Sequence, residues 1–292
     1  MPAQPSILPG VPRVARYLSF SVDPETPAEA SLAAVGNLDI DERMAVGLGQ
    51  PLLAHWGSAV DALRTFPALS GPGVQVPSEQ HALWLWLRGE DQGELVIRSN
   101  ELVDALSGEF YLEQSVDAFK YGSDELGKDL TGYEDGTENP TGDEALEAAF
   151  ATGDMAGSSF VAVQQWVHDL GKFGAYSEAE QDHIIGRRKS DNEEIADAPE
   201  SAHVKRAEQE SFSPEAIVLR RSMPFSQTFG EGLMFVAFGK TLDAFEVQMR
   251  RMAGLDDGIA DALFRFSHPV NGAYYWCPPM ADGRLNLGGI DR

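Results

Sequence analysis

The sequence contains a single cysteine, Cys277, among its 292 residues. One cysteine excludes an intramolecular disulfide and any zinc site built from several thiolates of one chain. Basic residues are also scarce, since 22 Lys and Arg stand against 46 Asp and Glu and give a formal net charge of −24. Phosphate backbones and anionic lipid headgroups repel such a surface, so we expect neither nucleic acid nor a membrane as a partner.

Long apolar runs are missing as well. None approaches the ~18 residues needed to span a bilayer. The first residues, MPAQPS, lack the basic region and apolar run of a secretory signal. Hydrophobic residues still make up 43% of the chain, which is enough for a substantial core. We therefore expect a soluble, cytoplasmic protein.

Several common catalytic motifs are absent. The sequence has no P-loop, no Gly-x-Ser-x-Gly nucleophile elbow and no strand-linked Gly-x-Gly-x-x-Gly. No two of its histidines lie one helical turn apart, which argues against a multi-histidine zinc site. A lone histidine can be a surface or core residue, but it can also be an axial ligand to haem iron. The histidines are His55, His81, His168, His183, His203 and His268.

The first half of the chain alternates between strand and helix periodicity. Period-two patterns predict strands over 14–22, 45–48, 81–87 and 110–119, and helical patterns cover 27–44 and 90–106. Thr26 is the expected N-cap of the first helix. Trp84 and Trp86 alternate with leucines, which favours core packing over stacking on a substrate.

The second half repeats this rhythm. Strands are predicted over 159–167, 216–221, 233–238 and 274–277, the last of the chain, and helices over 177–185 and 241–253. Ser177 and Glu180 have the spacing of a capping box. The segments 81–106 and 233–253 look like the same strand-helix unit, which suggests duplication.

This order of elements predicts an α+β fold with antiparallel sheets. We expect two ferredoxin-like α/β sandwich domains of the dimeric α+β barrel type, an N-terminal one over 1–125 and a C-terminal one over 126–292. The boundary is placed in the Gly-rich and charged stretch 121–129.

The most informative segment is the loop Gly132-Tyr133-Glu134-Asp135-Gly136-Thr137-Glu138-Asn139-Pro140. Its glycines allow positive φ and close approach to a ligand, and Asn-Pro ends any regular element. Asp135 is therefore expected on a tight loop, where a fixed carboxylate can do acid/base chemistry. On pattern alone, an ordinary surface turn explains the loop equally well.

Two other segments could contribute to a site. The stretch 186–213 is long and irregular, and such loops are usually functional or disordered. It carries His203 among basic residues. Arg220 and Arg221 end an apolar strand, so one of them faces the core side, where an arginine must be paired or bind a ligand.

Together these segments resemble the dye-decolourising peroxidase family, and in particular its bacterial cytoplasmic class B branch. The loop 132–140 resembles the family's Gly-x-x-Asp-Gly signature. Ile185-Gly186-Arg187-Arg188-Lys189, Ser201-Ala202-His203-Val204, Leu219-Arg220-Arg221-Ser222-Met223-Pro224-Phe225 and Asp261-Ala262-Leu263-Phe264-Arg265-Phe266-Ser267 follow in the family's order. The resemblance covers most of the chain and is strongest from Tyr121 onward.

The resemblance implies one haem b per chain, bound in the C-terminal half. His203 matches the proximal iron ligand, and Asp261 matches the acid that accepts a hydrogen bond from it. Arg187 occupies the position of a haem-propionate partner, and Gly136 and Thr137 are expected to contact the cofactor.

On the other face of the haem, Asp135 and Arg220 match the distal pair. Asp135 would move a proton between the two oxygens of hydrogen peroxide, and Arg220 would stabilise the developing charge, giving a high-valent iron-oxo intermediate. Ser222 departs from the Asn that some class B members carry, and has a shorter reach, but could hold a distal water. Because the reference pKa of Asp is ~3.9, we expect an activity optimum below neutrality unless burial raises that pKa strongly.

The implied donors are dyes, phenolics and other small aromatic molecules. A large dye cannot reach a buried iron, so electrons would pass through a surface tyrosine or tryptophan. The candidates are Tyr133, Tyr274, Tyr275, Trp166 and Trp276.

Two other functions stay open at this point. One is a haem carrier or storage protein that uses His203 without peroxide chemistry, and the other is a haem-free α+β enzyme or binding module. The family generally forms homo-oligomers. The C-terminal segment 285–290 also resembles, weakly, the tail that directs some relatives into protein nanocompartments (encapsulins).

Overall fold

The computed structural model describes residues 2–122, 127–288 and 290. Its strands are β1 (Val14–Val22), β2 (Met44–Leu48), β3 (Leu69–Gly71), β4 (Val74–Val76), β5 (Leu83–Gly89), β6 (Phe110–Phe119), β7 (Ser159–His168), β8 (Leu219–Arg220), β9 (Met223–Gln227), β10 (Gly230–Gly239), β11 (Ser267–Pro269), β12 (Ala273–Cys277), β13 (Met280–Ala281) and β14 (Arg284–Leu285). Its helices are α1 (Ala28–Gly36), α2 (Gln50–His55), α3 (Gln92–Leu106), α4 (Gly142–Ala149), α5 (Leu170–Gly174), α6 (Glu178–Ile185), α7 (His203–Arg206) and α8 (Asp243–Met252), with short 3₁₀ turns η1 (Gly153–Met155), η2 (Gln209–Ser211) and η3 (Ala262–Arg265).

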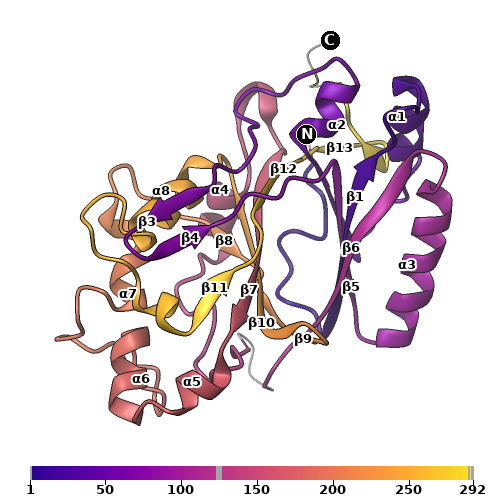
Figure 1. Ribbon diagram of the computed structural model, residues 1–292. Coiled ribbons are helices and arrows are strands. Elements are labelled where there is room, and N and C mark those ends of the chain that lie inside the picture. The colour runs from indigo at the N-terminus through magenta and orange to yellow at the C-terminus, as the bar shows by residue number, and fades with distance from the viewer. Residues whose placement is uncertain (1, 123–126, 289, 291–292) are drawn as a thin grey trace.

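One antiparallel sheet organises the molecule (Figure 1). Its strand order is β11-β7-β12-β2-β5-β1-β6-β9-β10-β8, and an additional pairing between β7 and β10 closes the sheet on itself. The strands from β7 round to β10 therefore form a closed barrel, with β8 and β11 as extensions. Closure removes most of the open strand edges that a flat sheet would expose.

The inside of the barrel is a dry aromatic core. Tyr17, Trp84, Trp86, Phe238 and Tyr275 are all at most 2% exposed. The ring of Tyr17 stacks on that of Trp86 with centroids 6.2 Å apart, and Trp84 stacks on Tyr275 at 5.8 Å. The prediction that the two tryptophans pack in the core is confirmed.

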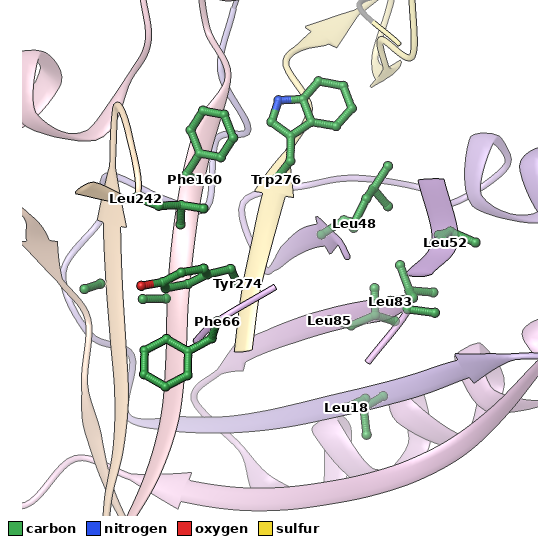
Figure 2. Close-up of a cluster of buried hydrophobic side chains, with 14 of the residues drawn as sticks. Leu18, Leu48, Leu52, Phe66, Leu83, Leu85, Phe160, Leu242, Tyr274 and Trp276 are labelled. Atoms are coloured by element: carbon green, nitrogen blue, oxygen red, sulfur yellow. The ribbon is translucent and has the colours of Figure 1, made fainter. Parts of the chain in front are cut away.

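The outer face of the same sheet packs against helices. Side chains of α3 and α8 join strand residues in a second buried cluster. Figure 2 shows part of it, with Tyr274 and Phe66 lying together at one end and Leu83 and Leu85 at the other. The short hairpin β3–β4 comes from the first half of the chain but lies beside α8, where Gly71 packs directly against the carbonyl of Ala253 (Figure 1). The two halves of the sequence thus share one core.

Most predicted elements are present close to their expected bounds, and the α+β class with antiparallel strands is confirmed. Strand β6 matches its prediction, and the Ser177–Glu180 capping box starts α6. The first helix is wrong in length, because α1 ends at Gly36 and Asn37 follows as its C-cap. Its N-cap is Pro27, with no side-chain cap, so the prediction of Thr26 is also wrong.

The strand expected over 216–221 is reduced to Leu219–Arg220. Gln209 takes the preceding backbone away from the sheet, because its carbonyl accepts from the N–H of Ala216 and its side-chain oxygen accepts from that of Val218. Two short strands, β13 and β14, follow β12, which is therefore not the last strand. The segment 186–213 is also more ordered than expected, since it contains α7 and η2.

No helix among the described residues is long and apolar enough to cross a membrane. Residues 123–126 of the expected domain boundary lie outside the described part, as does Gly289 of the C-terminal segment.

Candidate functional site

A cavity lies between the outer face of the sheet and the helical layer. The sheet side supplies Gln164, Trp166, Arg220, Leu233 and Phe235. The other lining residues are Asp129, Thr131, Tyr133, Glu134, Asp135, His168, Ile185, His203, Ala207, Phe245, Gln248, Met249, Met252, Leu263, Phe266 and Ser267. The cavity therefore brings together Asp135, His203 and Arg220, which the sequence predicted as one site.

His203 is the first residue of α7, and it lines the cavity. Its Nδ1 lies 2.8 Å from Oδ2 of Asp261, whose side chain is fully buried. A carboxylate can only accept, so Nδ1 carries the proton and Nε2 is left as the nitrogen that can bind a metal. Asp261 is itself held by the N–H of Leu263, which donates to Oδ1 at 2.8 Å.

Gly186 allows α7 to lie where it does. It ends α6 with φ at +95°, a conformation that favours glycine. A Cβ at this position would lie 2.2 Å from Cγ1 of Val204, the neighbour of His203. Any larger residue would therefore push His203 away from its place in the cavity.

The loop carrying Asp135 is a backbone-defined turn, as predicted. Gly136 has φ at +88°, and a Cβ there would meet the Asn139 amide at 2.8 Å. The Asn139 side chain ties the loop to β8 through both backbone polar groups of Arg220. Its Oδ1 accepts from the backbone N–H of Arg220 at 2.8 Å, and its Nδ2 donates to the backbone carbonyl of Arg220 at 3.1 Å. This clamp fixes the spacing between Asp135 and Arg220.

Burial raises the pKa of Asp135 above its ordinary value, because the cavity wall replaces the water that would solvate the charge. The positive charge of Arg220 opposes this rise, and the negative charge of Asp129 adds to it. The direction of this pKa shift is the one that would move the expected acidic optimum upward.

Arg220 and Arg221 have different partners. Arg220 lines the cavity, and its buried Nε has no hydrogen-bond partner among the described residues. Arg221 is 8% exposed and donates to the backbone carbonyls of Leu8, Pro9 and Arg220. Burial without a carboxylate partner in the described chain lowers the pKa of Arg221 to about 10. Arg220 is therefore the arginine available to a ligand in the cavity, and Arg221 is held by backbone carbonyls.

Sequence reasoning missed a polar cluster at the end of β7. His168 Nε2 lies 3.0 Å from Oδ2 of Asp129, and its Nδ1 lies 2.7 Å from Oγ of Ser267. Burial raises the pKa of Asp129, but bonds from His168 and Thr131 outweigh it and hold that pKa below its ordinary value. The three residues of the cluster are 39 and 99 positions apart, so no local motif marks it.

The other predicted site residues lie outside the described lining of the cavity. The hydroxyl of Ser222 accepts from the backbone N–H of Val236 at 3.3 Å. Arg187 pairs with Glu138 and Glu194 and donates to the carbonyl of Asn192. Thr137 accepts from the Asn192 side chain at 2.9 Å.

The expected electron-relay residues are not on the surface. The candidates are all buried, with Tyr133 at 4%, Trp166 at 6%, Tyr275 at 1%, and Tyr274 and Trp276 at 0% exposure. Tyr133 and Trp166 line the cavity. Tyr274 reaches it indirectly, because its ring lies 6.0 Å from that of the lining residue Phe245. The idea of a surface tyrosine or tryptophan is therefore wrong for these five, since barrel strands and helices cover them.

The donor set of the cavity fits a haem better than a bare ion. The described residues contain no group of three or more His, Cys, Asp or Glu able to hold a metal. A haem needs one protein nitrogen, an apolar slot and polar groups at its open face. Nε2 of His203, the apolar residues of β10 and α8, and the unpartnered donor of Arg220 meet these needs.

Comparison with known proteins identifies related sequences and structures. Residues 127–282, more than half of the chain, match the family described as Dyp-type peroxidase, C-terminal. The dye-decolorizing peroxidase of Mycolicibacterium paratuberculosis is 30% identical over 228 residues, which cover 75% of this chain and 63% of that protein. This chain thus spans less than two thirds of that relative.

Solved structures agree over nearly the whole chain. A dye-decolorizing protein from V. cholerae has a TM-score of 0.83 at 27% identity, covering 94% of this chain and 97% of that one. A variant of DypB from Rhodococcus jostii RHA1 in complex with heme has a TM-score of 0.81 at 26% identity, covering 96% of both chains. With the family match over the C-terminal half, these similarities show that the chain belongs to the Dyp-type peroxidase family.

Proposed function

We propose that this protein is a haem-dependent peroxidase that reduces hydrogen peroxide and takes electrons from dyes, phenolics and similar small aromatic donors. One observation carries the proposal. His203, oriented by Asp261, enters the cavity from the helical side, while Asp135 and Arg220 line the same cavity, with Arg220 on the sheet side. A haem carrier needs the histidine, but it needs no acid and guanidinium facing it.

A bound haem b supplies the iron at which peroxide is reduced and electrons are received. His203 holds the iron through Nε2. Asp261 keeps the proton on Nδ1 and makes the imidazole a stronger donor. In this role the pair fixes the cofactor's position and tunes its electron density.

Asp135 acts on the peroxide as base and then as acid. Its carboxylate would take the proton from one peroxide oxygen and return it to the other, which would leave as water while the haem supplies the two electrons for cleavage of the O–O bond. The guanidinium of Arg220 stabilises the negative charge that develops as the O–O bond breaks. The clamp from Asn139 keeps the two groups at a fixed spacing, so little reorganisation is needed.

The remaining site assignments are also proposals. Gly136 and Thr137 contact the cofactor edge. Arg187 binds a haem propionate beside its ion pairs with Glu138 and Glu194. Ser222 holds a distal water, since a hydroxyl that accepts from the Val236 N–H keeps its own O–H donor.

We also propose that the barrel consists of two ferredoxin-like halves, 1–125 and 126–292. Within each half, strands pair over long registers, as β1 does with β6 from Val14–Phe119 to Val22–Phe110. Between the halves the described registers are short: Trp276 opposite Leu48, and Ala118 opposite Phe225. The two short registers support a division at these seams.

Assembly and location follow from the same family membership. We propose a homo-oligomer in the cytoplasm, without nucleic acid or membrane partners. Size-exclusion chromatography with light scattering tests the first statement, and cell fractionation tests the second. Loading into a nanocompartment is tested by co-purification with a shell protein before and after removal of residues 285–292.

The decisive experiment starts with the absorption spectrum of the haem-reconstituted protein before and after addition of peroxide. We expect a Soret band that changes with peroxide, and oxidation of an anthraquinone dye. Asp135→Ala and Arg220→Ala should keep the Soret band and lose dye oxidation by a factor of roughly 10² or more. A Soret band with full activity in both variants would refute the proposed roles, and a protein that binds haem but never reacts with peroxide would be a carrier.

A further inference from the structure

The sheet side of the cavity carries a second unpartnered donor besides Arg220. Gln164 is 1% exposed, it lines the cavity, and its amide nitrogen Nε2 has no hydrogen-bond partner among the described residues. Buried polar groups are nearly always paired, so an orphan donor in a cavity wall indicates a missing acceptor.

The orientation of this amide is set by Trp166. The indole Nε1 of Trp166 lies 3.1 Å from Oε1 of Gln164. An indole N–H can only donate, so the oxygen of the amide must face it and Nε2 must be the free end. The two N–H groups of Nε2 therefore point away from Trp166.

Strand register places Gln164 on the same face as Arg220. Gln164 lies opposite Phe235 in the β7–β10 pairing, and Arg220 lies opposite Ala237 in the β8–β10 pairing. Positions 235 and 237 are two residues apart on one strand, so all four side chains share a face. Gln164 and Arg220 therefore form one wall of donors, while His203 comes from the helical layer across the cavity.

We propose that Gln164 is a third polar group of the peroxide site, and that Nε2 donates a hydrogen bond to the oxygen ligand that also faces Asp135 and Arg220. This inference rests on the proposed peroxidase function. An amide neither gains nor loses a proton near neutral pH, so the part of Gln164 is to hold and orient the ligand. Proton transfer stays with Asp135.

Fluoride is a suitable probe, because it binds ferric haem and accepts hydrogen bonds from groups on the open face. We expect Gln164→Leu to weaken fluoride binding to the reconstituted protein roughly three- to tenfold, the range for loss of one net hydrogen bond. The second-order rate of reaction with peroxide should fall by a similar factor. Gln164→Glu keeps the acceptor for Trp166 but replaces the donor with an acceptor, so it should weaken fluoride binding at least as much.

Gln165 provides the matched control. It is the next residue on β7, it is 8% exposed, and its side chain contacts Gln114 rather than the cavity. Gln165→Leu should leave fluoride affinity and the peroxide rate within twofold of the wild type.

The outcomes separate this inference from the function on which it rests. If the wild type binds haem and reacts with peroxide, but both Gln164 variants bind fluoride as the wild type does, only this inference fails. If both variants fold by circular dichroism yet lose haem, Gln164 holds the cofactor and the inference is overturned. It is also overturned if both variants fail to fold, because the amide is then part of the core. A wild type that binds no haem refutes the function itself.

Discussion

The two faces of strands β7 and β10 differ in how completely their side chains are packed and hydrogen-bonded. On the face turned into the barrel, Val161, Val236 and Phe238 are fully buried among aromatic rings. On the face turned to the helices, Gln164 has an unpartnered donor, and Leu233 and Phe235 line a cavity. Both faces are mostly apolar, so hydrophobicity does not distinguish them. On these two strands, the cavity face differs from the barrel face because it carries a buried amide whose donor is unused.

The largest effect is expected at the helical wall opposite this cavity face. His203→Ala removes the nitrogen that would hold the iron, so we expect loss of the axial-histidine spectral signature and of nearly all peroxidase activity. His268→Ala is the control, because His268 is exposed on β11. A spectrum of His203→Ala identical to that of the wild type would show that another residue binds the metal.

The two faces should also respond differently to truncation. Trp84 is fully buried inside the barrel, so Trp84→Ala should lower the free energy of unfolding of the haem-free protein by about 3–5 kcal/mol. Phe235→Ala enlarges a cavity that already exists, so we expect a clearly smaller loss. Urea denaturation followed by circular dichroism measures both values. Equal losses would mean that the cavity face is as tightly packed as the barrel interior.

The pH dependence of the reaction should follow the charges around Asp135. As a base, Asp135 must be ionised, and burial raises its pKa, so the acid limb of kcat/KM for peroxide should lie above ~3.9, the ordinary value for Asp. Arg220→Leu removes a charge that lowers this pKa, so the limb should move to higher pH. Asp129→Asn removes a charge that raises it, so the limb should move to lower pH.

Asp154→Asn is the control for these shifts, because Asp154 is exposed in η1. Its pH profile should coincide with that of the wild type. Shifts of the same sign in Arg220→Leu and Asp129→Asn would show that the acid limb does not report the charge of Asp135.

The smallest effect is expected at adjacent tyrosines on the two faces of β12. The Tyr274 ring packs on Phe245 of the cavity wall. The Tyr274 hydroxyl donates to Oε2 of Glu246 at 3.3 Å, so a carboxylate is in place to take its proton. If Tyr274 passes electrons from bulky donors, Tyr274→Phe should slow oxidation of a large dye a few-fold and leave oxidation of a small phenol unchanged. Tyr275→Phe is the control, since Tyr275 stacks on Trp84 inside the barrel. Equal dye rates in both variants would exclude this route.

Much of the site could be predicted from the sequence, because its key residues lie in short ordered motifs. The loop around Asp135, the segment with His203, the strand with Arg220 and the segment opened by Asp261 each resemble a motif of the family and occur in the family's order. Their convergence on one cavity is a property of the closed sheet. The contact of His203 with Asp261 spans 58 residues, and that of Asn139 with Arg220 spans 81.

The remaining features depend on distant partners that no local pattern encodes. Gln164 looks like any polar residue in a strand until Trp166 and the cavity define its free end. The ion pair of Arg187 with Glu138 cannot be predicted from the sequence, because the fold brings the two distant residues together. The sequence does not mark the end of α1 at Gly36, because the apolar period continues past it through Leu38 and Ile40, which pack into the core from a non-helical segment.

The two short registers between the halves of the barrel suggest where the polypeptide can be divided into two fragments. Each half ends in strands, β2 and β6 on one side and β9 and β12 on the other, whose outer edges are completed only by the opposite half. If the two halves were expressed as separate fragments, 1–125 and 126–292, each fragment would expose two unpaired strand edges that match those of the other. Mixing the two fragments would therefore show whether the strand edges alone bring the halves together.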